Sequence, residues 1–471
     1  MFNLNFTQKA STNRVVFYNL LSMVLIKGIG FITSPIFSRL LSTTNYGIIT
    51  IYSTWLGVFS VFYGLQTVST LGNARSEYPL DDQAKYQSSI LSLSIFSSLF
   101  FSIITIALLG PISIAFKLRR ELIVLLLIQA TGSTMVDFLQ SKFTMEFDAA
   151  KSMLLSIVTV LLNVSVSIVL VLALPEETNY FGRAIGQCTA YFIVGLASAV
   201  YIFRRDHTTF NREYWRFCLP LSLPLILHSL SGMILNSCDK VMLQHMMSEA
   251  DVGIYGLALG FSSLITALWS AFNNAWLPFF YEYTRTNETD KVISCGKNYL
   301  ELFTALTVGF ILLSPDVYHV YASSDYWSGT MLIPLFVLAF YFLMAYSFAA
   351  NYEFYYKKSQ LIAIGTISAA AINIVLNYLL IKTYGAFGTA VATASAYLLL
   401  FLFHFFCAKF AVKESVFPFS AMFFAPWLII TVAVSIFSII CGTRLMPIRW
   451  LLGAVIGVVE LARIIKRKAI F

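Results

Sequence analysis

Apolar runs of about the length of a membrane-spanning helix recur along almost the whole chain. A helix needs roughly 20 apolar residues to cross the hydrocarbon core of a bilayer. Alternating β-barrel patterning is absent, and an open sheet would leave backbone polar groups unsatisfied in lipid. The sequence therefore predicts an all-α integral membrane protein with about 14 transmembrane helices, at 15–37, 46–69, 88–110, 121–140, 153–174, 181–203, 218–238, 253–276, 299–320, 329–351, 360–381, 387–408, 420–441 and 447–463.

Little sequence remains outside these runs. The chain is 58% hydrophobic and only 11% charged, far from the balance of a soluble domain. The longest polar stretch between runs, Thr70 to Gln87, has only 18 residues. This excludes a nucleic-acid-binding domain, a Rossmann domain and any sizeable catalytic domain outside the membrane. The six cysteines form no CxxC pair, and no His, Cys, Asp and Glu cluster has the spacing of a metal site.

The basic residues are distributed unevenly between the two sides of the predicted membrane. Of 31 Lys and Arg residues, 21 fall in the two termini and the even-numbered connections, and only 8 in the odd-numbered connections. Because Lys and Arg concentrate in cytoplasmic loops, both termini are predicted to be cytoplasmic. An even number of spans follows. Arg449 and Glu460 leave only a short apolar core in the last span, which is the weakest of the 14.

Two distant pairs of segments match at the same offset of 206 residues. Leu40–Ile48 resembles Met246–Ile254, and Phe181–Tyr191 resembles Phe387–Tyr397. The repeated unit holds six spans, so both copies enter the membrane in the same orientation. We expect two parallel six-helix lobes and an appendix, at 1–205, 206–411 and 412–471, the last comprising two helices and a basic tail. Two lobes without a soluble domain favour a transporter.

Short motifs lie at the ends of several spans: Arg39–Gly47, Asp239–Leu243, Glu249–Tyr255, Trp276–Tyr281 and Tyr384–Ala390. Together and in this order they resemble bacterial polysaccharide flippases of the multidrug/oligosaccharidyl-lipid/polysaccharide exporter superfamily, over most of the chain. The nearest branch resembles the O-antigen and capsule repeat-unit flippases. The resemblance implies a non-enzymatic transporter of the bacterial cytoplasmic (inner) membrane. Its cargo would be an undecaprenyl-pyrophosphate-linked oligosaccharide, moved to the periplasmic leaflet by alternating access, with no cofactor beyond a proton or sodium gradient. Its partners would be membrane lipids and the polysaccharide polymerase and chain-length proteins. Nucleic acid is not an expected partner.

Four polar residues within spans are candidates for contact with the cargo. Lys27 lies in the middle of the first span, where a lysine costs about 2.5–3.5 kcal/mol, so capture of a pyrophosphate is favoured over a structural ion pair. Arg183 starts the sixth span and could contact phosphate, glycan or only the membrane interface. Asn163 and Gln129 could bind sugar hydroxyls, although packing between helices is the simpler interpretation.

Three charged residues lie at the outer ends of the first span of each half: Arg39, Asp239 and Lys240. They could close an outer gate by forming ion pairs between the two lobes. Interfacial anchoring is the simpler alternative.

Asp137 and Glu301, near cytoplasmic span ends, and His228, in mid-span, are candidates for ion coupling. Contact with headgroup water is the simpler interpretation of the two acids, and helix packing is the simpler interpretation of His228.

Glycine and proline recur in the leading span of each half and could form hinges, because proline removes a backbone hydrogen bond and bends a helix. The alternative is that both residues are simply commoner in membrane helices than in soluble ones. The candidates are Gly28, Gly30, Pro35 and Pro224.

Three other functions compete with the flippase. An exporter of cationic drugs would require acidic residues deep in the membrane. A peptidoglycan-precursor flippase would carry more arginines within its spans. A membrane glycan polymerase would need longer periplasmic loops and a pair of carboxylates.

Overall fold

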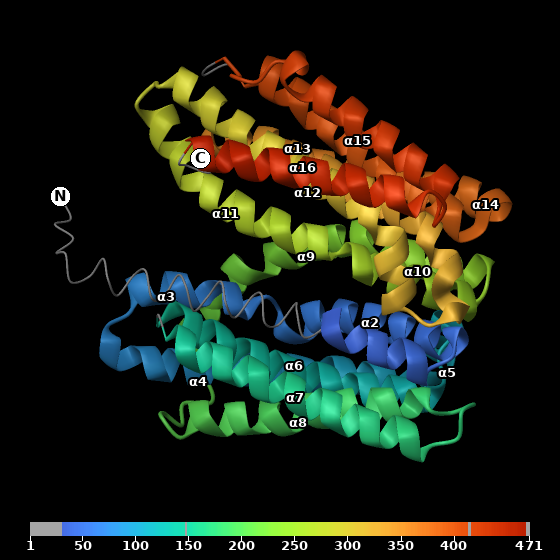
Figure 1. Ribbon diagram of the computed structural model, residues 1–471. Coiled ribbons are helices and arrows are strands. Elements are labelled where there is room, and N and C mark those ends of the chain that lie inside the picture. The colour runs from blue at the N-terminus through green and yellow to red at the C-terminus, as the bar shows by residue number, and fades with distance from the viewer. Residues whose placement is uncertain (1–30, 147, 413–415, 468–471) are drawn as a thin grey trace. The chain divides into compact units, whose positions relative to one another are not determined.

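The computed structural model describes residues 31–146, 148–412 and 416–467, apart from the side chains of His228, Ile464 and Arg467. Every regular element in these ranges is a helix (Figure 1). The chain forms two compact units, Met1–Ser237 and Cys238–Phe471. The division falls inside one long helix, α9 (Arg212–Met246).

The first unit opens with a helical segment at 31–40. Ser42 then ends the connection by accepting a hydrogen bond from the Asn45 backbone N–H at 3.3 Å, which is the geometry of a helix N-cap. The elements that follow are α2 (Thr43–Gly64), η1 (Thr67–Thr70), α3 (Leu71–Glu77), α4 (Leu80–Ala107), α5 (Leu109–Phe116), α6 (Arg120–Met145), α7 (Ala149–Ala173) and α8 (Tyr180–Phe203).

Glycines allow α8 to pack closely against two neighbours, α6 and α7 (Figure 1). A Cβ on Gly182 would lie 2.6 Å from the Leu170 backbone carbon, and one on Gly186 would lie 2.6 Å from Ser167 Cα. Gly195 meets the backbone of Gly132 on α6 in the same way, at 2.5 Å. Small residues at such crossings let helix backbones approach in lipid. The glycines therefore bring the start of α8 against α7.

The second unit contains the remaining helices. After α9 come α10 (Glu249–Ser262), α11 (Leu264–Arg285), α12 (Thr289–Tyr321), η2 (Ser324–Leu332), α13 (Ile333–Tyr355), α14 (Ser359–Phe410), α15 (Ala421–Cys441) and α16 (Met446–Arg467). α14 is broken at Gly385, whose φ of +55° and ψ of −136° interrupt the helix. A positive φ is accessible to glycine without the steric penalty of a Cβ.

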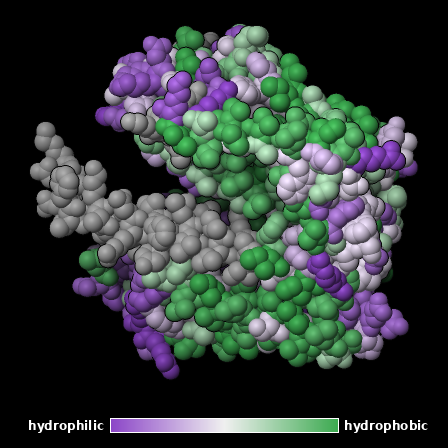
Figure 2. Space-filling view, in the orientation of Figure 1, coloured by the Kyte–Doolittle hydropathy of each residue, from purple (hydrophilic) through white to green (hydrophobic). Residues whose placement is uncertain are grey.

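The described residues contain 11 helices long and apolar enough to cross a membrane. One of them is α14, which contains two predicted spans on either side of Gly385. Large apolar side chains are exposed along the helices, and Figure 2 shows broad apolar areas with hydrophilic residues gathered at the edges. The prediction of an all-α, multi-pass membrane protein is confirmed. The total of 14 spans and the cytoplasmic termini stay predictions.

Two elements differ in detail from the sequence-based expectation. α9 continues to Met246, beyond the predicted end at Cys238, so Asp239 and Lys240 lie within a helix rather than after it. α16 forms as a helix but is not among the 11 helices that are long and apolar enough to cross a membrane. The buried Arg449 guanidinium donates to the Leu312 carbonyl at 2.8 Å and to Asp316 at 2.9 Å, both on α12. Arg449 is therefore buried against α12 and not exposed on the surface of α16.

Candidate functional site

In the first unit, polar side chains of α7 and α8 gather around one guanidinium. Arg183, in the first turn of α8, donates to Asn163 Oδ1 at 2.9 Å and to Ser167 Oγ at 3.0 Å. Its carbon Cζ lies 4.0 Å from the centre of the Phe37 ring, in cation–π geometry. When the Gln187 amide is oriented with its oxygen toward Arg183, that oxygen accepts two further bonds, at 3.2 and 3.1 Å. We call these five residues the arginine cluster.

The arginine cluster holds a positive charge without an acid. Within the described ranges, every hydrogen-bond and ring partner of Arg183 is neutral. Arg183 is only half-buried, so part of its surface remains accessible. A cation in a membrane span is costly and usually faces a polar path or a partner. The arrangement therefore suits a mobile anion, and the fixed neutral acceptors hold the guanidinium in place for it.

In the second unit, a buried acid lies within α9. Asp239 is 3% exposed, and its Oδ1 accepts from the Lys240 backbone N–H at 2.8 Å. The Tyr255 hydroxyl of α10 donates to the other carboxylate oxygen, Oδ2, and also interacts with Thr393 of α14. Asp239 and Tyr255 together thus connect α9, α10 and α14 inside their own unit.

Cys238, the residue before Asp239, contacts a second set of polar side chains on α14. Cys238 Sγ donates to Asn373 Oδ1 at 3.3 Å, and Asn377 Nδ2 donates to the same oxygen at 2.9 Å. The Nδ2 of Asn373 and the Oδ1 of Asn377 are buried and have no hydrogen-bond partner in the described structure. We call Cys238, Asp239, Tyr255, Asn373, Asn377 and Thr393 the aspartate cluster.

The aspartate cluster contains carboxylate, amide and hydroxyl oxygens, the ligands that hard cations prefer, but both Asp239 oxygens and Asn373 Oδ1 already accept hydrogen bonds within the protein. No group of three or more His, Cys, Asp or Glu side chains gathers in the part of the chain that the structure describes. Transition-metal coordination has no support from these residues.

One buried pair in the second unit was not predicted. His404 Nδ1 of α14 lies 2.8 Å from Glu353 Oε2 of α13, and neither side chain is exposed. A Cβ on Gly365 would lie 2.2 Å from His404 Nε2, so this glycine makes room for the ring. The available signal was an ionisable residue in an apolar run, His404, since such residues are rare in membrane spans.

The other candidate residues lie apart from the arginine cluster. Gln129 Oε1 accepts from the Tyr52 hydroxyl at 2.6 Å between buried parts of α6 and α2. Asp137 is exposed on α6 and has neither a hydrogen bond nor an ion pair within the described residues. Glu301 is buried in α12, with Lys297 Nζ at 3.9 Å from its carboxylate.

The gate and hinge candidates are only partly described. Arg39 is exposed and donates to the Pro35 carbonyl at 2.9 Å, one turn earlier in the segment 31–40. Pro224 lies inside α9 with Pro220. Other predicted site residues lie outside the described part of the chain: Lys27, Gly28, Gly30 and the side chain of His228.

Known structures share this fold. The lipid II flippase MurJ, in an inward closed conformation, is similar over 96% of this chain and 99% of its own, with a TM-score of 0.71 and 16% identity. A multidrug resistance MATE family transporter of the MOP superfamily, in an inward-facing conformation, is similar over 84% of this chain and 95% of its own, with a TM-score of 0.59 and 16% identity. The fold is therefore that of the multidrug/oligosaccharidyl-lipid/polysaccharide exporter superfamily.

Sequence comparison identifies the family within this fold. The model of the family described as "Polysaccharide biosynthesis protein" matches residues 13–284. A Haemophilus influenzae protein of the Lsg locus is 24% identical over 353 residues, which cover 72% of this chain and 83% of that protein. The chain belongs to the polysaccharide biosynthesis protein family, and its long apolar helices are those of a multi-pass membrane protein.

Proposed function

We propose that this protein is a flippase for undecaprenyl-pyrophosphate-linked oligosaccharide repeat units, such as those of O-antigen or capsule. It would carry them from the cytoplasmic to the periplasmic leaflet of the bacterial inner membrane by alternating access. The observation that carries the proposal is the guanidinium of Arg183, whose partners among the described residues are all neutral. Membership in a polysaccharide biosynthesis family and the exporter fold support it.

The chemistry of the cargo matches the arginine cluster. A pyrophosphate ester is anionic, and a guanidinium binds phosphate oxygens through two parallel N–H donors. Asn163 and Ser167 hold the guanidinium from one side, which lowers the entropy lost when the anion binds. Amide and hydroxyl groups beside the phosphate could also bind the first sugar. Polysaccharide polymerase and chain-length proteins would then use the product on the periplasmic side.

A peptidoglycan-precursor flippase is the second candidate. Its cargo would carry the same lipid pyrophosphate, and the similarity to the lipid II flippase extends over 96% of this chain. The two functions differ in the glycan, so an experiment must read out which lipid-linked glycan accumulates.

The test is a deletion strain complemented with the wild-type protein or with Arg183→Ala, in which lipid-linked glycans are assigned to a leaflet. We expect repeat units to accumulate on the cytoplasmic face in the deletion strain and with Arg183→Ala, and surface polymer to be lost. Arg120→Ala is the matched control, because Arg120 is an exposed arginine at the start of α6. Accumulation of peptidoglycan precursor instead would support the second candidate. Normal leaflet distribution of both glycans would refute the flippase.

A further inference from the structure

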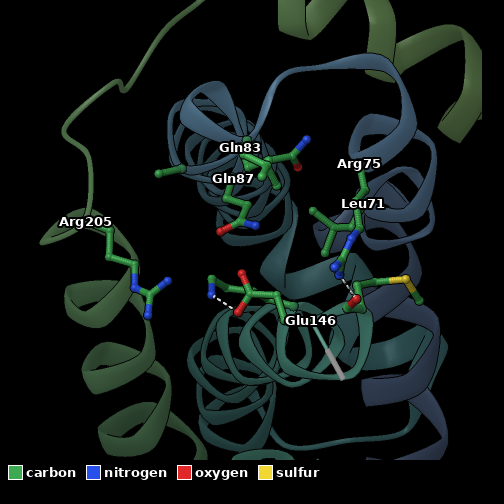
Figure 3. A pocket seen from close by; sticks show the side chains of 10 residues that line it. Leu71, Arg75, Gln83, Gln87, Glu146 and Arg205 are labelled. Atoms are coloured by element: carbon green, nitrogen blue, oxygen red, sulfur yellow. Dashed lines mark hydrogen bonds and ion pairs between the residues drawn. The ribbon is translucent and has the colours of Figure 1, made fainter. Parts of the chain in front are cut away.

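A basic pocket opens where the ends of α3, α4, α6 and α8 meet in the first unit (Figure 3). Its volume is about 190 Å³. This is well below the roughly 300–1,000 Å³ of sites for drug-sized ligands, so the pocket suits a small group. The polar side chains that line it are Arg75, Gln83, Gln87, Lys142, Glu146 and Arg205.

Positive charge exceeds negative charge in this pocket. Three of its lining side chains are cations and one is a carboxylate. The buried Lys142 is paired with that carboxylate, since its Nζ lies 2.6 Å from Glu146 Oε2. Arg205 donates to the Tyr201 hydroxyl at 2.8 Å, and Arg75 donates to the Met145 carbonyl. Pairing neutralises Lys142, and the two guanidiniums leave the pocket with a net positive charge.

One buried amide in the pocket lacks a hydrogen bond. Gln87 is 9% exposed, and its side chain makes no hydrogen bond within the described structure. Figure 3 shows the Gln87 side chain extending from α4 toward Glu146. Arg205, which follows the end of α8, lies on another side of the pocket. The Gln87 amide lines the pocket, so a polar group that enters the pocket can accept a hydrogen bond from it.

We propose that this pocket binds a phosphate group, either the headgroup of an anionic phospholipid or soluble phosphate. Two guanidiniums and an amide supply N–H donors of the kind that bind phosphate oxygens. The helix ends that form the pocket lie on the predicted cytoplasmic side, where basic pockets between membrane helices bind anionic headgroups. The site is distinct from the arginine cluster and does not depend on the identity of the transported glycan.

The test uses the full-length protein in detergent micelles. Retained phosphatidylglycerol is measured by native mass spectrometry, with phosphatidylcholine as the neutral comparison and inorganic phosphate as a competitor. We expect Arg205→Gln to weaken phosphatidylglycerol binding roughly tenfold or more, because a charge-assisted hydrogen bond is lost. Arg204→Gln is the matched control, since Arg204 is the adjacent exposed arginine and does not line the pocket.

A second variant separates binding from folding. Gln87→Leu removes no hydrogen bond of the unliganded protein, so we expect weaker phosphate binding with an unchanged or higher melting temperature of the unliganded protein. Preference for phosphatidylglycerol without competition by inorganic phosphate would assign the site to a lipid headgroup. Competition by inorganic phosphate, with no preference between the two lipids, would assign it to soluble phosphate. Wild-type binding in both pocket variants, or an equal loss in Arg204→Gln, would overturn the proposal.

Discussion

The arginine cluster and most of the aspartate cluster lie on helices that the predicted internal repeat relates to each other. The repeat aligns Phe181 with Phe387, so Arg183 corresponds to Thr389 and Gln187 to Thr393. The first unit therefore carries a cation where the second carries a hydroxyl.

The preceding helix of each repeat supplies the supporting amide. α7 carries Asn163 and Ser167, and the first half of α14 carries Asn373 and Asn377, each pair four residues apart and on one helix face. In the first unit these side chains serve Arg183, and in the second they bond to each other and to Cys238.

The difference lies in the charge and in its accessibility. Arg183 is half-buried and has only neutral partners in the described structure, whereas Asp239 is buried and bonded to Tyr255 inside its unit. On the predicted repeat, the two halves share one scaffold and differ in the side chains that it carries: a cation with neutral partners in the first unit, and an internally bonded acid in the second. Four predictions test these two units and the contacts within them.

The largest effect is expected from reversing the charge of the arginine cluster. Arg183→Glu should abolish translocation, because a carboxylate repels the pyrophosphate at the same position. Arg183→Lys should keep part of the activity, since it retains charge but loses the bidentate geometry. The measurement is surface polymer per unit of membrane-inserted protein. Arg120→Glu serves as control, and wild-type polymer in Arg183→Glu would remove Arg183 from the cargo path.

The buried pair of the second unit should contribute strongly to its stability. His404→Ala leaves the Glu353 carboxylate buried without its imidazole, so we expect the unfolding free energy to fall by roughly 3–5 kcal/mol. Denaturant unfolding in micelles measures the change. The double variant with Glu353→Ala should be less destabilised than the sum of the two single variants. Simple additivity would show that the pair contributes no coupling energy.

A smaller loss of unfolding free energy is expected when the hydrogen bond from Tyr255 to Asp239 is removed. Tyr255→Phe removes the hydroxyl donor of the buried Asp239 and should cost about 1–3 kcal/mol. Tyr378→Phe is the control, because Tyr378 is exposed on α14, and this change should stay within about 0.5 kcal/mol. Equal effects of the two variants would mean that the Asp239 bond adds no stability. The same unfolding assay applies.

The last comparison concerns the helix contact that holds Arg183 near Asn163, and its control carries the smallest expected change. Gly186→Ala places a Cβ 2.3 Å from Ser167 Oγ and should destabilise the protein by roughly 1–3 kcal/mol. Gly309→Ala meets nothing within 4 Å and should stabilise α12 by about 0.5–1 kcal/mol. Thermal unfolding of the two variants gives the comparison. A stabilising Gly186→Ala would show that α7 and α8 can separate without cost.

Several site residues were recognisable in the sequence because polar groups are rare in membrane spans. Arg183 and Asn163 were both candidates, and the structure brings them together. Gln129 was a candidate by the same rule, but it bonds to Tyr52 instead. Rarity in a span thus identifies a residue with a constrained environment and does not say which partner constrains it.

The sequence by itself determined the membrane class, the helical architecture and the family, because run length, hydropathy and motif order are local properties of the chain. The tertiary structure decided which polar groups meet. Arg183 and Asn163 are 20 residues apart, and His404 and Glu353 are 51 apart. Their contacts depend on how helices cross at glycines such as Gly186 and Gly365, and a three-dimensional crossing leaves no periodic pattern in a single sequence.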